Sequence, residues 1–251
     1  MNPLLKVRDL CKTFLFEGRN VLVLKDISFN VNEHEFVSII GSSGCGKSTL
    51  LELIAGITVP DCGNIFKHGV EISGKAGFAG YMPQEDLLLP WLSLMENAIL
   101  PDRIQRKDIA AAKQKVMQLL PDFGLEGYEH HKPWQLSGGM KQRAAFLRTV
   151  MSEAEILLLD EPFANLDALT RLQMQKWLLD IQAKLKQTII FVTHDIDEAI
   201  RLSDTIYVMD SQPAPFIFQT KVPPELHEGN SDITHPQWAE LRSELTGKLL
   251  K

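Results

Sequence analysis

Apolar and polar residues are distributed along the chain in a way that predicts strands alternating with helices. Residues 36–40, 155–160 and 188–193 are almost continuously apolar, which is typical of parallel strands buried on both faces. Helical patterns follow at 47–55 and 195–202, and apolar residues recur at helical spacing between Met174 and Leu185. Because strands and helices alternate, we predict an α/β fold around a mixed core sheet that is mainly parallel.

The N-terminal region has a different pattern, in which apolar and polar residues alternate one by one. Ile27, Phe29 and Val31 fall on one face, with polar residues between them, as in half-buried antiparallel strands. We expect strands at residues 4–8 and 22–31 and a turn at 18–20, forming an N-terminal antiparallel β subdomain.

The segment from about residue 86 to residue 151 is helical and poor in strands. Its clearest amphipathic stretch is 107–120, which ends before a proline. We expect this segment to be an inserted α-helical subdomain between two core segments, 1–85 and 152–210.

Residues 211–251 make up a C-terminal tail. The pattern indicates a strand near residues 216–218 and a helix at about 236–250. The tail carries no recognisable motif, so no separate function is predicted for it.

Composition narrows the function classes only slightly. The chain has 251 residues, a formal net charge of -6 and three cysteines. The negative charge and the lack of a basic run argue against a protein that binds nucleic acid non-specifically. An odd number of cysteines without a C-x-x-C pair favours free thiols in the cytoplasm. The sequence has no apolar run of the roughly 18 residues that a membrane helix needs.

A phosphate-binding loop is the strongest local signal. Residues 41–49 satisfy the G-x-x-x-x-G-K-[ST] pattern between a predicted strand and a predicted helix. The N–H groups of such a loop surround an anion at a helix N-terminus. Lys47 is expected to reach the β- and γ-phosphates, and Ser48 to hold Mg²⁺. The predicted nucleotide contacts are Gly41, Ser42, Ser43, Gly44, Cys45, Gly46, Lys47, Ser48 and Thr49.

Cys45 within this loop has a structural and a reactive interpretation. The side chain is expected to be structural, but the adjacent helix N-terminus could lower its pKa. On that basis we predict that alkylation of the Cys45 thiol blocks nucleotide binding and that excess nucleotide protects the thiol.

Further motifs follow the loop in a fixed order. They are Gln84 in Tyr81-Met82-Pro83-Gln84, Leu136-Ser137-Gly138-Gly139, Asp160-Glu161, Asn165-Leu166-Asp167, and His194 in Val192-Thr193-His194-Asp195. Together with the phosphate loop, they make residues 5–210 resemble the ATP-binding-cassette (ABC) ATPases. The resemblance departs from the usual pattern at Met140, where the family more often has Gln, and at Phe14, where it more often has Tyr.

The resemblance implies a role for each motif in ATP hydrolysis. Asp160, together with Ser48 and Gln84, would hold Mg²⁺, and Gln84 would also sense the γ-phosphate. Glu161 would be the general base that activates water, assisted by His194 on the γ-phosphate. Catalysis is thus expected to depend on Glu161, His194 and Lys47.

The same resemblance implies a head-to-tail dimer. Ser137, Gly138 and Gly139 would contact the ATP held by the phosphate loop of a second copy, because they present N–H donors at a helix start. Asp167 would cross the interface and couple the two sites. Phe14 would stack on adenine, with Phe16 as the alternative.

The resemblance further indicates an importer subunit. Residues 89–97, after Gln84, are similar to those of ATPases that power uptake of nitrate, sulfonates, taurine or thiamine precursors. The implied partners are integral membrane permease subunits and, through them, a periplasmic or surface solute-binding protein, with the chain peripheral on the cytoplasmic face of the inner membrane. Trp91 beside Pro90 is either part of an exposed patch for the permease or a core residue.

Three other functions remain possible at this stage. The chain could serve an exporter or a lipid-extraction ABC complex, or it could be a mechanical ABC ATPase of DNA repair or translation. A P-loop small-molecule kinase is the third, although a kinase has no use for the signature motif or His194. The transported solute is not encoded in a subunit that does not touch it.

Overall fold

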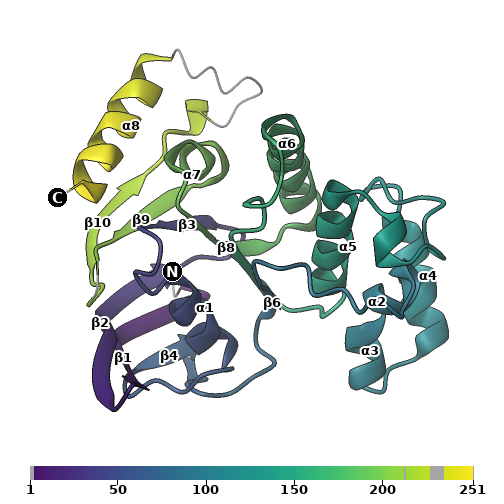
Figure 1. Ribbon diagram of the computed structural model, residues 1–251, viewed down its shortest axis with the longest axis horizontal. Coiled ribbons are helices and arrows are strands. Elements are labelled where there is room, and N and C mark those ends of the chain that lie inside the picture. Colours follow the sequence, from purple (N-terminus) through teal and green to yellow (C-terminus); the bar gives the residue numbers. More distant parts are fainter. Residues whose placement is uncertain (1–2, 212, 227–234, 251) are drawn as a thin grey trace.

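The computed structural model describes residues 3–211, 213–226 and 235–250, and it contains two sheets (Figure 1). The smaller sheet has the order β2-β1-β4-β5, and the larger has the order β10-β9-β3-β8-β7-β6. Of the predicted tail, residues 212, 227–234 and 251 lie outside this description, as do residues 1–2 of the predicted N-terminal segment.

The antiparallel sheet consists of β1 (Leu5–Phe16), β2 (Arg19–Val31), β4 (Cys62–Lys67) and β5 (Val70–Glu71). Its first two strands are longer than predicted, and the turn is tighter. Glu17 and Gly18 both have positive φ, 48° and 75°, so they form the two-residue turn that the expected turn at 18–20 places too late. Consecutive positive φ values match the right-handed twist of a hairpin, which lets pairing continue to Phe16–Arg19.

The six-stranded sheet forms the core. Its strands β3 (Phe36–Ile40), β6 (Gly80–Met82), β7 (Ile156–Asp160), β8 (Thr188–Thr193) and β9 (Thr205–Met209) are parallel, and β10 (Phe216–Lys221) pairs antiparallel with β9. Every residue of β3, β7, β8 and β9 is buried. The continuous apolar runs therefore predicted β3, β7 and β8 correctly, because both faces of the sheet are covered.

The helices lie around this sheet. They are α1 (Lys47–Ala55), α6 (Ala168–Leu185) and α7 (Ile196–Leu202) in the core, and α2 (Leu94–Ala98), α3 (Leu100–Ile104), α4 (Ile109–Leu119) and α5 (Gly138–Val150) in the helical region. Two short 3₁₀ turns, Pro133–Gln135 and Pro224–Leu226, complete the pattern. Figure 1 shows α2 to α5 gathered at one end of the molecule, beyond α6.

An aromatic cluster joins the helical region to α6. The ring of Trp177 meets Phe123 and Phe146 edge to face, with centroids 5.3 and 5.5 Å apart. The Trp177 indole N–H also donates to the carbonyl of Asp122 at 3.0 Å. These contacts fix the helical region against α6, and α5 also packs on β6 of the core sheet.

The tail contains both elements that the pattern predicts. β10 extends the core sheet, and α8 (Pro236–Leu249) packs against α7. Trp238 of α8 is 1% exposed and shares a hydrophobic cluster with Ile200 of α7. The tail is thus packed on the core by the same burial of apolar side chains that holds the rest of the fold.

Candidate functional site

The phosphate loop spans the gap between β3 and α1. Gly46 is the residue before α1 and has φ 115°, a conformation that L side chains rarely adopt. A Cβ on Gly41 would lie 2.8 Å from Cys45 Sγ and 3.0 Å from the carbonyl oxygen of Met209. Backbone conformation therefore requires glycine at position 46, and close packing requires glycine at position 41.

Lys47 lies inside this loop. Its side chain is 5% exposed, and its ammonium donates to the carbonyl oxygens of Gly41 and Ser42 at 2.9 and 3.0 Å. The Nζ atom also lies 3.8 Å from Glu161 Oε1. A buried ammonium is costly unless it is paired, so these contacts hold the charge in place within the loop.

Asp160 ends strand β7 next to the loop. Its carboxylate accepts hydrogen bonds from the Tyr81 hydroxyl at 3.3 Å and from the Ser48 hydroxyl. Burial raises the pKa of Asp160 above its usual range, although both hydrogen bonds oppose the shift. The nearby charge of Lys47 also opposes the shift and that of Glu161 adds to it, so the carboxylate is only partly compensated. Its oxygens make this place suitable for a cation with a preference for oxygen.

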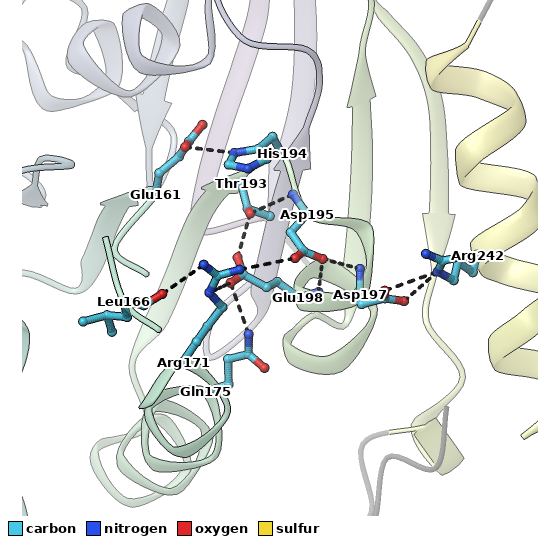
Figure 2. A network of polar contacts seen from close by, with 10 residues as sticks. All are labelled: Glu161, Leu166, Arg171, Gln175, Thr193, His194, Asp195, Asp197, Glu198 and Arg242. Atoms are coloured by element: carbon cyan, nitrogen blue, oxygen red, sulfur yellow. Dashed lines mark hydrogen bonds and ion pairs between the residues drawn. The ribbon is translucent and has the colours of Figure 1, made fainter. Parts of the chain in front are cut away.

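Glu161 and His194 meet at the ends of neighbouring strands. Glu161 Oε2 lies 3.0 Å from His194 Nδ1, and the Glu161 backbone N–H donates to the carbonyl of Val192 at 3.0 Å (Figure 2). Glu161 has φ 43°, which turns the chain away from the strand direction immediately after Asp160. The two consecutive carboxylates consequently have different partners, Asp160 with two hydroxyls and Glu161 with Lys47 and His194.

Cys45 does not have the lowered pKa that its position predicts. Its side chain is buried, and this burial raises the pKa of the thiol, although Lys47 opposes the shift. The expectation was wrong because the thiol faces the packed interior beside Gly41 rather than the mouth of the loop. A buried neutral thiol reacts slowly, so alkylation of Cys45 is no longer expected to be a simple way to block the loop.

The signature residues begin helix α5. Ser137 is the residue before the helix, and its hydroxyl accepts from the Met140 N–H at 3.3 Å. A Cβ on Gly138 would meet the Leu166 side chain, and one on Gly139 would meet Thr170 at 3.1 Å. The signature is therefore packed against the start of α6, and Figure 1 shows α5 well apart from α1 and its loop.

Three other predicted residues lie in loops or at an edge. Gln84 is exposed in the loop after β6, and Asp167 is exposed before α6, where its carboxylate accepts from the Thr170 N–H at 3.1 Å. Phe14 is 37% exposed on β1, with Lys12 Nζ 5.3 Å from its ring centroid. Phe16 is 65% exposed, so both aromatic candidates present a ring to solvent and Phe14 stays a prediction.

Trp91 lies on the surface. Its side chain is 66% exposed, and its carbonyl accepts from Lys132 Nζ at 2.8 Å. The interpretation as a core residue is therefore excluded, and the exposed alternative is retained.

Sequence reasoning missed several polar residues around the site. Tyr81 belongs to a motif that was recognised, and only its hydrogen bond to Asp160 was not foreseen. Arg171, which is partly exposed, forms a network behind His194 with the buried Gln175 and Glu198. No local pattern relates these residues, because they come from two different helices.

Comparisons with known proteins give a consistent result. A family model described as "ABC transporter" matches residues 24–164. The formylaminopyrimidine import ATP-binding protein ThiZ of Halalkalibacterium halodurans is 48% identical over 204 residues, which cover 81% of this chain and 80% of that protein. The nitrate transport protein NasD of Klebsiella oxytoca is 40% identical over 217 residues, covering 85% of this chain and 83% of that protein.

A third relative and a solved structure agree with these two. The aliphatic sulfonates import ATP-binding protein SsuB of Bacillus cereus is 40% identical over 219 residues, covering 86% of each chain. The dimeric post-hydrolysis structure of the ATP-binding cassette MJ0796 bound to ADP and Pi has a TM-score of 0.76 and 28% identity. That match covers 87% of this chain and 99% of the solved chain.

Proposed function

The chain belongs to the ABC transporter family and is an ATPase, and from this premise we propose that it powers import of a small solute through separate membrane permease subunits. The observation that carries the hydrolytic part of the proposal is a cluster of three side chains. Glu161 lies 3.8 Å from Lys47 and 3.0 Å from His194. The word "import" in the names of ThiZ and SsuB supports the direction of transport.

ATP binding is assigned to the phosphate loop. The loop N–H groups and the N-terminus of α1 favour the negative charge of the phosphates. Lys47 is already directed into the loop by its bonds to Gly41 and Ser42, so little reorganisation is needed for it to reach phosphate oxygens. Phe14, partly exposed on β1, supplies an aromatic face for adenine.

Magnesium fits the oxygen donors beside the loop. The described residues contain no group of three or more histidine, cysteine, aspartate or glutamate side chains that could enclose a metal ion. Mg²⁺ instead is usually held by one or two protein ligands together with phosphates. We assign Ser48 and Asp160 to this role, with Gln84 from the neighbouring loop. When bound, Mg²⁺ neutralises charge on the phosphate oxygens.

Glu161 is the residue we assign as general base. Its carboxylate lies beside the end of the sheet, where the γ-phosphate of a loop-bound ATP would project, and it can accept a proton from an attacking water. The contact with His194 orients the carboxylate, and the exposed imidazole remains available to donate to a γ-phosphate oxygen. These residues position and polarise the water while the charge of Lys47 stabilises the phosphates.

A second copy is needed to complete the site in this proposal. Ser137, Gly138 and Gly139 start α5 away from the phosphate loop of their own chain, so their N–H donors are available to ATP bound elsewhere. The dimeric structures of MJ0796 support a dimer. In the proposed arrangement, the signature of one copy faces the loop of the other. Asp167, exposed beside the signature, is assigned to that interface.

The membrane partners are assigned from the surface and from the relatives. Trp91 and Leu87 are exposed apolar residues in the loops between β6 and α2, which suits them to contact a permease subunit. We therefore place the chain peripherally on the cytoplasmic face of the membrane, with a solute-binding protein acting through the permease. Nitrate, an alkanesulfonate, taurine and a thiamine precursor are the candidate solutes, with no nucleic acid involved.

The structure contributes one further observation on membranes. Among the helices of the described residues, none is both long and apolar enough to cross a bilayer.

Hydrolysis by the Glu161→Gln variant tests the mechanism. We expect the rate to fall by at least about 100-fold, because a general base contributes roughly that much, while ATP binding is retained. Size-exclusion chromatography with ATP and Mg²⁺ should show that the variant accumulates as a dimer. A monomeric variant with wild-type turnover would show that Glu161 is not the base.

Coexpression tests the importer assignment. With candidate permease subunits from the same genome, the chain should copurify in a membrane complex, and a solute-binding protein loaded with its solute should stimulate ATP hydrolysis. Stimulation by a lipid or an exported compound instead would favour the exporter. Activity that depends on DNA or ribosomes would favour a mechanical ATPase.

A further inference from the structure

A buried carboxylate lies directly behind the candidate switch histidine. Glu198 of α7 is 6% exposed and accepts hydrogen bonds from the Thr193 hydroxyl at 2.7 Å and from the Gln175 amide at 3.2 Å (Figure 2). The Thr193 hydroxyl in turn accepts from the Asp195 N–H at 3.0 Å. Both residues that flank His194 are thus held by one side-chain network.

Arg171 connects that network to the loop that precedes α6. It lies in the first turn of α6, and its guanidinium donates from Nη2 to the carbonyl of Leu166 at 3.1 Å. The same guanidinium lies 3.9 Å from Asp195 and 3.8 Å from Glu198. Figure 2 shows Arg171 between Leu166 on one side and Asp195 and Glu198 on the other.

Arg171 and Glu198 are close, but they do not form a hydrogen bond through Arg171 Nε. The Nε atom of Arg171 is buried and makes no hydrogen bond to another described residue, although Glu198 Oε1 is only 3.8 Å away. A buried unsatisfied donor is unfavourable, and a shift of about one ångström would turn the ion pair into a hydrogen bond. In the structure, Arg171 Nε and Glu198 Oε1 are too far apart for a hydrogen bond. A small movement of Arg171 would form that bond.

The buried charge of Glu198 favours an approach of the Arg171 guanidinium. The carboxylate is largely removed from water, and Arg171 and Asp195 are the charged groups that face it. Burial raises the pKa of Glu198, which reflects charge that is incompletely compensated. An approach of the guanidinium would supply that compensation.

We propose that Arg171 and Glu198 are positioning residues that link residues 165–167, before α6, to His194. The inference rests on the proposed function, in which residues 165–167 lie at the dimer interface. Movement of the Leu166 carbonyl on dimer closure carries Arg171 toward Glu198. Glu198 then fixes the Thr193 hydroxyl, and with it the backbone on both sides of His194. Neither residue touches ATP.

Steady-state kinetics of Arg171→Gln and Glu198→Gln provide the first test. We expect kcat to fall about tenfold for each, while binding of a fluorescent ATP analogue changes less than about twofold. Arg242→Gln is the matched control, because Arg242 of α8 donates to Asp197, the neighbour of Glu198 on α7, at 2.9 Å. Its kcat should stay within about twofold of wild type.

A double-mutant cycle separates positioning from a general structural role. If Arg171 acts through His194, adding Arg171→Gln to His194→Ala should cause no further loss of single-turnover rate. Independent, multiplicative losses would overturn the proposal, as would equal losses for Arg242→Gln and Arg171→Gln. Arg171→Lys replaces the glutamine variant if that variant does not fold, and it should retain part of the activity because it keeps the charge.

The two proposals fail in distinguishable ways. Absence of ATP hydrolysis by the wild-type protein, with or without its permease, would contradict the proposed function. Wild-type hydrolysis together with unchanged kcat in Arg171→Gln and Glu198→Gln would leave the proposed function intact and overturn only the positioning role.

Discussion

The phosphate loop and the signature segment are both glycine-containing starts of helices, but they are constructed differently. Lys47 is buried in the loop, where its ammonium donates to two carbonyls of its own chain. Ser137 is exposed at the start of α5, and its hydroxyl only closes the first turn of its own helix. The loop also has Asp160, Glu161 and His194 beside it, whereas the signature packs on Leu166 and Thr170.

In the proposed dimer, the phosphate loop with its neighbouring strand ends is one half of the ATP site, and the signature segment of the other copy is the second half. The loop contributes an ammonium, and the adjacent strand ends contribute two carboxylates and an imidazole, so we expect this half to bind a nucleotide alone. The signature contributes helix-start N–H groups and a hydroxyl, which stabilise an anion but supply no base. We therefore expect ATP binding to depend on the phosphate-loop half and turnover to depend on both halves.

Removal of Lys47 should have the largest effect. We expect Lys47→Ala to weaken ATP binding about 10- to 100-fold, because charge-assisted bonds to phosphate are lost, and to abolish measurable hydrolysis. Binding can be followed by titration with a fluorescent ATP analogue. Lys67→Ala is the control, because that lysine pairs with Glu155 away from the loop. Unchanged ATP affinity in Lys47→Ala would contradict the assigned role.

Removal of the signature hydroxyl should affect turnover but not binding. We expect Ser137→Ala to lower kcat about tenfold and to leave monomer ATP affinity within about twofold, since a hydrogen bond to the partner's nucleotide is lost. Ser93→Ala is a matched control, because Ser93 also caps a helix of the same region, accepting from the Glu96 N–H at 3.2 Å. Both variants lose a helix cap worth about 1 kcal/mol. Equal kcat in the two variants would show that Ser137 acts only as a cap.

Thiol reactivity tests how closed the loop is without nucleotide. Cys45 is buried, Cys11 is partly exposed and Cys62 is exposed. We expect a thiol reagent to modify Cys45 at least about tenfold more slowly than Cys11 in the folded protein, because its raised pKa and burial both limit the thiolate. Mass spectrometry of timed digests measures the order. Rapid modification of Cys45 that ATP prevents would instead restore the original expectation of a reactive loop thiol.

Acid pH should weaken an ion-pair cluster in the helical region by a small amount. Lys107 and Lys115 each lie 2.5 Å from Glu153 and lower the pKa of its carboxyl from 4.5 to about 2. The lowered folded pKa means that Glu153 stabilises the fold above about pH 4.5 and loses this contribution as the pH falls toward 2. Because the side chain is about half exposed, Glu153→Gln should lower the free energy of unfolding by less than about 1 kcal/mol at neutral pH.

Urea unfolding at several pH values measures this effect. The difference between wild type and Glu153→Gln should be greatest near neutral pH and should shrink as the pH falls from about 5 to about 2. High salt should reduce it as well, because the cluster is on the surface. A difference that grows as the pH falls would contradict the direction of the shift.

Local sequence patterns predicted the elements and most of the candidate site. Continuous apolar runs identified β3, β7 and β8 because these strands are buried on both faces, and the phosphate-loop pattern located the start of α1. Each of these signals depends on residues within one turn or one strand. The order of the motifs then indicated the family, which the comparisons confirm.

Other features depended on packing between distant segments. The hairpin turn lies at Glu17–Gly18 rather than 18–20, because pairing extends to the ends of β1 and β2. Burial raises the pKa of Cys45, and this burial comes from a core cluster that joins distant segments of the chain. The exposure of Trp91 could not be read from composition either.

By itself, the sequence determined the phosphate loop, the strand-end carboxylates and the start of α5, because the backbone conformations they need are encoded by neighbouring glycines, serines and apolar residues. Only the tertiary structure decided which side chains meet. Glu161 reaches His194 because β7 and β8 are adjacent and in register, and Arg171 reaches Glu198 because α6 lies beside α7. Electrostatic and hydrogen-bond energies depend on separations of a few ångströms, and those separations are set by the sheet order and helix packing of the whole fold.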